Sequence, residues 1–321
     1  MSQIEPVNGG DRPSYALSAF AKLTAISTFI LICAGALITG NKAALSDPTW
    51  PKFAGQNYPT ADTFVGGMRY EDSHRIIAGT VGILIAVLAF WVQFKVRKRA
   101  PKVLAWGAVA CVVAQAVIGG FIILYLRPMV VSILHACVGQ ALFMMLVALA
   151  VILSPKRVGS VESSGTPRPG ASFFRIQCVV ACCVVYCLLI LGATVRHAAD
   201  VFMPQLVLHI SLALFTVVML IWLSLQVFTR YRDVADLRRV IWTLFTLIAV
   251  QYGLGVVAIF ANRARLQPEA PDQAHVLLST AHVGVGALIL ISFLIMALRA
   301  FQHLPVSQAA EKHQTLTEKL A

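Results

Sequence analysis

The sequence predicts an all-α polytopic membrane protein with eight transmembrane helices. Of its 321 residues, 58% are hydrophobic and only 12% are charged, and the mean hydropathy is +0.78. Soluble domains carry about 25% charged residues, so half of the usual charge is missing. The apolar residues form long continuous runs rather than alternating patterns, and helices are the elements that span a bilayer in such runs. The composition therefore excludes a soluble enzyme with one membrane anchor.

Eight apolar runs can be placed along the chain, and each is close to the about 20 residues that cross the hydrocarbon of a bilayer. Lysine and arginine gather after the second, fourth and sixth runs, as at 95–102. By the positive-inside rule these connections face the cytoplasm, which places both termini there. The net charge of +12 is therefore interpreted as basic loops and not as a nucleic-acid surface. The predicted spans are 18–40, 74–95, 102–126, 129–153, 173–195, 203–228, 238–261 and 274–300.

A linker divides the chain into two similar halves. Residues 154–172 are rich in Gly, Pro and Ser, which is typical of a flexible cytoplasmic connection. Spans three and seven share a Gln-containing, Gly-ending segment (QAVIG and QYGLG), and spans four and six share a Leu-His pair. Each half has four spans, so both enter the membrane from the same side. The sequence predicts two pseudo-two-fold-related four-helix bundles, at 1–153 and 173–300, followed by a cytoplasmic tail at 301–321.

Each even-numbered span carries a histidine toward its outer end. Hydrocarbon offers an imidazole no partner, so a histidine at this depth is a functional-site hypothesis. Each histidine is followed four residues later, on the same helix face, by a small residue that leaves room for a flat macrocycle. The pattern predicts two haem sites toward the outer face, one in each half. The first pairs His74 with His135, the second pairs His209 with His282, and the small residues are Ala78, Gly139, Ala213 and Gly286.

Other interpretations of the polar residues were weighed against haem. A single membrane histidine is often a packing residue, but four at matched depth in a repeat favour ligands. Zinc is less favoured, because two histidines per half leave a tetrahedral site short of ligands. His197 and His275 are interpreted as interfacial residues. Arg75 and Arg196 are the predicted partners of haem propionates.

Glu71 sets the first site apart from the second. It lies one helical turn before His74 and shares its face, whereas no acidic residue precedes His209 in this way. A carboxylate in a place of low dielectric can hold a proton or stabilise a cation that forms beside it. The sequence therefore predicts chemistry at the first site and electron delivery at the second.

These residues resemble the haem A synthase family of cytochrome oxidase assembly. The resemblance covers nearly the whole chain and rests on VGGMRYEDSHR (65–75), LGATVRH (191–197) and SDPTWP (46–51). It implies that successive hydroxylations convert a methyl group of haem O into the formyl group of haem A. It also implies that His74 and His135 flank the substrate haem beside catalytic Glu71, while His209 and His282 ligate a haem b that passes electrons. The first outer loop lacks the cysteine pair that some members carry.

The resemblance further implies partners and a location. It places the protein in a bacterial inner membrane, surrounded by lipid, with haem O handed over by a haem O synthase. The sequence does not identify the electron donor, for which quinol is one candidate, and leaves a homo-oligomer open. No nucleic-acid partner is expected.

Three other classes of protein are the alternatives. A diheme b-type membrane cytochrome would explain four histidines, but it gives Glu71 no role. A secondary transporter predicts helices broken at the bilayer midplane, and no span is broken there. A haem O prenyltransferase would need acidic clusters for magnesium diphosphate, which the loops lack.

Overall fold

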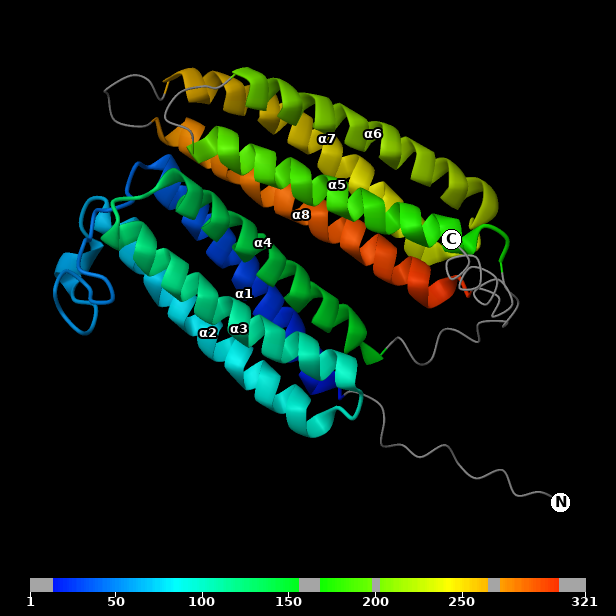
Figure 1. The fold of residues 1–321 in the computed structure, drawn as a ribbon, viewed down its shortest axis with the longest axis horizontal. Coiled ribbons are helices and arrows are strands. Elements are labelled where there is room, and N and C mark those ends of the chain that lie inside the picture. Colours follow the sequence, from blue (N-terminus) through cyan, green and yellow to red (C-terminus); the bar gives the residue numbers. More distant parts are fainter. Residues whose placement is uncertain (1–13, 156–167, 198–202, 265–271, 306–321) are drawn as a thin grey trace, which may run out of the picture.

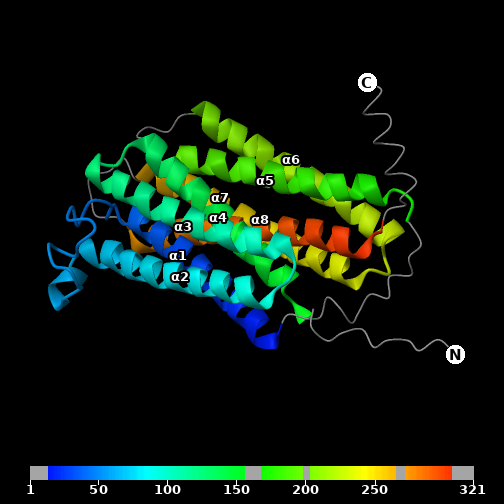
Figure 2. The ribbon, with the colours of Figure 1, turned by 60° about the horizontal axis from the view of Figure 1, so that its bottom comes forward.

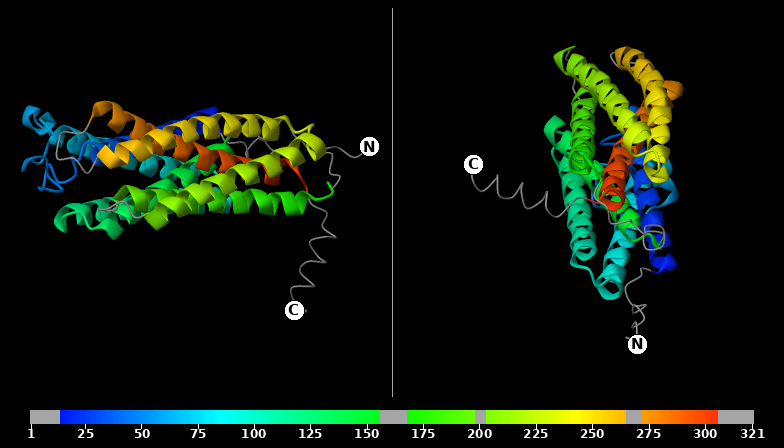
Figure 3. Two further views of the ribbon diagram at one scale, coloured as in Figure 1. Left: turned by 90° about the horizontal axis from the view of Figure 1, so that it is seen from above. Right: turned by 90° about the vertical axis from the view of Figure 1, so that its right-hand side faces the viewer.

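The computed structural model describes residues 14–155, 168–197, 203–264 and 272–305, and the described residues are helical apart from their connections. Eight of the helices are long and apolar enough to cross a membrane, and they run along one common long axis (Figure 3). The prediction of an all-α protein with eight spans is confirmed. The elements are α1 (Tyr15–Gly40), the 3-10 helix η2 (Ala61–Phe64), α2 (Met68–Lys95), α3 (Arg99–Leu124), α4 (Met129–Ile152), α5 (Ala171–His197), α6 (Met203–Arg230), α7 (Ala235–Ala264) and α8 (Gln273–His303).

Several helices begin before the predicted spans, and α2 shows the largest difference. It starts at Met68, six residues before the predicted start at 74. Residues 68–73 are polar, so hydropathy places the boundary too late, whereas helical hydrogen bonding continues through them. An ion pair between Arg75 and Glu71, 2.9 Å apart at positions i and i+4, supports this extra turn. Glu71 and His74 therefore both lie within the regular part of α2.

The helix contacts form two closed rings. In the first ring, α1 and α3 each pack against both α2 and α4, and in the second ring α5 and α7 each pack against both α6 and α8. Each ring has its own apolar core, which contains Leu88 and Leu146 in the first and Leu223 and Phe293 in the second. The rings touch through α1, α4, α5 and α8 (Figures 1 and 2). A pseudo-two-fold relation between the halves stays a prediction, and most of the linker and tail, 156–167 and 306–321, lies outside the described residues.

The two ends of the molecule differ in character. The start of α1 and the end of α8 lie at one end of the molecule, together with the basic connections that follow α2 and α6 (Figure 1). The opposite end carries the long segment 41–67, called here the outer loop. Trp50 of this loop packs on α3, because a Cβ atom placed on Gly120 would lie 2.9 Å from its Cη2 atom. A residue larger than glycine at 120 would displace the indole.

Candidate functional site

One cavity of about 1300 Å³ collects all the predicted site residues. It exceeds the roughly 300–1000 Å³ of ordinary small-molecule sites, and helices of both rings and the outer loop form its walls. The small residues predicted to leave room beside the histidines, Ala78, Gly139, Ala213 and Gly286, line the same cavity. The structure therefore joins both predicted sites into one continuous space. The predicted residues that line it are Glu71, His74, Arg75, His135, Arg196, His209 and His282.

A glycine of the preceding helix lies under each of the four imidazole rings. A Cβ atom placed on any of these glycines would come within 3.1–3.5 Å of Cε1 of the histidine, so a larger residue would push the ring into the cavity. The sequence showed Gly119 and Gly255 as the ends of the repeated segments QAVIG and QYGLG, but not the contact of any glycine with a histidine. Four pairs thus share one arrangement, which fixes where each ring sits. The pairs are Gly35 with His74, Gly119 with His135, Gly192 with His209 and Gly255 with His282.

The ring nitrogens fit iron ligation. Among the described residues, Nδ1 of His74, His135 and His282 is buried without a hydrogen-bond partner. Nδ1 of His209 lies 3.2 Å from the carbonyl oxygen of Leu188, to which it can donate. Such a bond leaves Nε2 as the ligand and orients the ring, as second-shell contacts of metal-bound histidines do.

The two histidines of each half also interact with each other. His74 lies within electrostatic range of His135, and His282 within range of His209. The described residues contain no group of three or more His, Cys, Asp or Glu side chains placed to hold a metal ion. A pair of imidazoles on either side of a macrocycle suits this arrangement better than a tetrahedral zinc site does.

The carboxylate of Glu71 is held at both oxygen atoms. Its Oε2 accepts a hydrogen bond from the backbone N–H of Asp47 (3.0 Å), and its Oε1 accepts one from Nη2 of Arg75 (2.9 Å). The side chain lines the cavity although the residue is only 4% exposed. Glu71 therefore faces the cavity in one fixed orientation.

Arg75 is the centre of a buried group that we call the outer carboxylate cluster, made of Asp47, Glu71, Asp72 and Arg75. Its Nη1 donates to Asp47 Oδ2 (2.6 Å), Asp72 Oδ1 (3.2 Å) and the Lys52 carbonyl (2.8 Å). Its Nη2 donates to the Asp47 carbonyl (2.7 Å) as well as to Glu71. The role of Arg75 as a propionate partner stays a prediction, while these contacts dock the outer loop on α2.

Asp47 was not predicted as a site residue. Burial acts to raise its pKa, but hydrogen bonds from Thr49 and Ala54 together with the charge of Arg75 lower the pKa to about 2. It is therefore ionised at neutral pH and pairs with Arg75. The segment SDPTWP signalled its importance only through the family resemblance, because its contact with α2 spans 28 residues of chain.

The end of the cavity formed by the last turn of α5 and the first turn of α8, called here its outer mouth, lies where the two rings meet. Nη2 of Arg196, at the end of α5, donates to the carbonyl of Ala36 in α1 (2.8 Å). His197 and His275 line the cavity here, and His275 Nδ1 lies 3.3 Å from Asp272. The mouth thus carries several cationic or titratable side chains from both rings.

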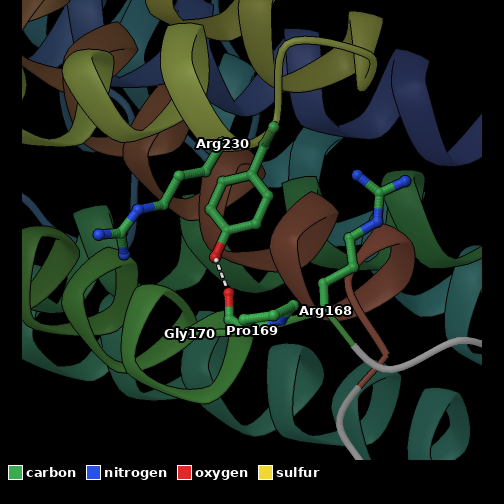
Figure 4. A pocket seen from close by; sticks show the side chains of 5 residues that line it. Arg168, Pro169, Gly170 and Arg230 are labelled. Atoms are coloured by element: carbon green, nitrogen blue, oxygen red, sulfur yellow. Dashed lines mark hydrogen bonds between the residues drawn. The ribbon is translucent and has the colours of Figure 1, made fainter.

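A second pocket, of about 620 Å³, lies between the start of α5 and the end of α6 (Figure 4). The Tyr231 hydroxyl donates to the Pro169 carbonyl (3.4 Å), and Arg168 forms a forked ion pair with Asp233 (2.8 and 2.6 Å). Arg230 completes the lining with Gly170. None of the predicted site residues lines this pocket, so the outer cavity is the candidate site.

Comparison with known proteins identifies the family of the chain. The sequence profile of a family described as cytochrome oxidase assembly protein (COX15-CtaA) matches residues 18–206, more than half of the chain. The chain belongs to this family. The matched segment contains Glu71, His74 and His135, and it ends just before His209.

Individual relatives extend the family match into the second half. A protein of Alkalihalophilus pseudofirmus named haem A synthase is 26% identical over 278 residues, which cover 77% of this chain and 89% of that protein. The haem A synthase of Halalkalibacterium halodurans is 26% identical over 283 residues, covering 77% and 88%. That of a Bradyrhizobium species is 32% identical over 151 residues, covering 42% and 40%. The family resemblance deduced from three sequence segments is confirmed.

Proposed function

We propose that this protein is a haem A synthase, which oxidises a methyl group of haem O to a formyl group. Family membership and the names of the relatives support this function. The observation that carries it is one cavity with two pairs of histidines and, as the one buried carboxylate that lines it among the described residues, Glu71 beside the first pair. A diheme cytochrome that only transfers electrons would leave this carboxylate without a role.

In the first site, His74 and His135 hold the iron of the substrate haem O. The glycines under their rings set the ring positions, and Ala78 and Gly139 leave room for the macrocycle. Bound iron and oxygen supply the oxidising chemistry, whereas the protein places the substrate and tunes its surroundings. The mostly apolar lining excludes water from the reacting methyl group.

Glu71 acts at the reaction centre of the first site. The Asp47 amide and the Arg75 guanidinium fix its oxygen atoms, so the carboxylate needs no reorganisation when charge develops on the substrate. It can take up a proton at Oε1 or Oε2, or stabilise positive charge at the methyl carbon being oxidised. Its fixed place beside His74 limits this role to the first site.

In the second site, His209 and His282 would hold a haem b, which would supply electrons for the oxidation in the first site. The hydrogen bond from His209 Nδ1 to the Leu188 carbonyl supports a permanently bound cofactor, because such contacts orient the ligand and raise its basicity. Both sites lie toward the outer face of the bacterial inner membrane, with both termini in the cytoplasm. The basic connections at the end opposite the outer loop support this orientation. An electron donor such as quinol and a haem O synthase complete the set of partners.

Pigment extracted from the purified protein tests the function. Haem A or hydroxylated haem O should accompany haem b when the protein is produced in cells that make haem O. Haem b alone would contradict the proposal and favour the diheme cytochrome.

The glycine under His282 gives a test of the second site. A Gly255→Ala variant should displace the ring, because the added Cβ would lie 3.3 Å from its Cε1 atom. We expect a changed absorption and electron paramagnetic resonance spectrum of the bound haem b, with unchanged helix content. Gly253→Ala on the same helix is the control, since its added Cβ meets no atom of the described residues within 4 Å. Equal spectra for the two variants would contradict the assignment of His282.

A further inference from the structure

The two halves differ in the cations that they offer at the outer mouth of the cavity. Gly35 and Gly192 occupy equivalent places, each under the histidine of the next helix. Four residues further along, α5 has Arg196, but α1 has Thr39. The first half therefore has no arginine at the position that corresponds to Arg196. A substrate with carboxylates would need a different cationic side chain in the first site.

Arg75 is poorly suited to supply that cation. Its two terminal nitrogens carry four hydrogen atoms, and five oxygen atoms of Asp47, Lys52, Glu71 and Asp72 already accept from them. A further carboxylate would have to break the contacts that dock the outer loop. Lys42 also lines the cavity, but it takes part in an interaction within the protein.

Arg127 lies in the turn between α3 and α4 and lines the same cavity. No hydrogen bond or ion pair joins its guanidinium to the residues that the structure describes. The turn holds Leu126 and Arg127 in the left-handed region, with φ of 57° and 60°, and the Arg127 amide donates to the Ile122 carbonyl (2.7 Å). Two successive left-handed residues with side chains are costly, and such strain is concentrated at functional sites.

The turn that contains Arg127 also lies at a suitable distance from His135 along the axis of α4. From the start of α4 at Met129 to His135 is a rise of about 9 Å. Arg127 therefore lies beyond His135 on the side of the cavity mouth, and charged propionates favour such a polar end of the site over its apolar interior.

We propose that Arg127 binds a propionate carboxylate of haem O in the first site. The proposal rests on the proposed function and assigns to Arg127 the contact that the sequence assigned to Arg75. A planar guanidinium recognises a carboxylate through two parallel hydrogen bonds. Because it comes from a turn and not from the outer carboxylate cluster, this contact leaves the fixed orientation of Glu71 unchanged.

Haem O and its dimethyl ester, titrated into the full-length protein in detergent, test the role of Arg127. The first-site absorption signal is the one that disappears in His135→Ala. Arg127→Gln should weaken the binding of haem O about tenfold. It should change the binding of the ester by less than about twofold, because the ester has no carboxylate to lose. Arg127→Lys should recover part of the affinity, and Arg69→Gln, an exposed residue outside the cavity, should leave it unchanged.

Three results would overturn the inference, and they separate it from the proposed function. Unchanged haem O binding in Arg127→Gln, or an equal loss for haem O and its ester, contradicts the role of Arg127 alone. Failure of the wild-type protein to bind haem O at a site that depends on His135 contradicts the proposed function, and the inference falls with it.

Discussion

Replacing Arg75 with methionine is expected to destabilise the protein strongly and to release the outer loop. The variant leaves Asp47, Glu71 and Asp72, which are 1%, 4% and 0% exposed, without their counter-charge. Removing one partner of a buried ion pair costs about 3–5 kcal/mol, because the remaining charge is uncompensated. Thermal unfolding in detergent and proteolysis within residues 41–67 should both show the loss.

Two comparison variants make the Arg75 result specific. Arg69→Met removes a cation from the same helix, but Arg69 is exposed, and among the described residues its guanidinium interacts with the ring and hydroxyl of the neighbouring Tyr70. It should unfold like the wild type. Adding Asp72→Asn to Arg75→Met should recover part of the stability, since one uncompensated charge is gone. If Arg75→Met were no less stable than Arg69→Met, the cluster would not hold the loop.

Replacing Glu71 with glutamine is expected to abolish most turnover while both haems still bind. Glutamine keeps the size of the side chain and can still accept from the Asp47 amide, but it has lost the charge and the site for a proton. Loss of a positioned acid or base lowers rates by about 10²–10⁴-fold. Formation of haem A from haem O, measured beside the absorption of both sites, gives the comparison.

Asp72→Asn is the matched control for Glu71. It removes one negative charge from the same cluster at the next position of α2, but Asp72 does not line the cavity. Its turnover should stay within a few-fold of the wild type. Full turnover in Glu71→Gln, or an equal loss in both variants, would contradict the role of Glu71 at the reaction centre beside His74.

The parts of the fold that repeat could be predicted from the sequence. Eight apolar runs could be identified as transmembrane spans because the thickness of the bilayer sets the length of a spanning helix. The histidines stood out because placing a polar imidazole in hydrocarbon costs free energy, and because four of them recur at matched depth. The start of α2 was placed too late because hydropathy detects the membrane and not the helix, which continues into polar residues 68–73.

Contacts between distant segments could not be predicted in this way. The path of the outer loop decides that Asp47 meets Arg75 and Glu71, and no periodic pattern encodes that path. Gly119 and Gly255 were visible as part of a repeat, but the contact of each glycine with a histidine depends on how closely neighbouring helices approach. Arg127 gave no signal in the sequence, because a left-handed turn without glycine has no compositional mark.

The central claim is that the two histidine pairs form two sites with different occupants. Haem extracted from the wild-type protein, His74→Ala and His209→Ala, and separated by chromatography, tests it most directly. We predict that His74→Ala keeps haem b and lacks haem O, hydroxylated haem O and haem A. His209→Ala should lack haem b and keep haem O. Loss of the same pigment from both variants would contradict two distinct sites.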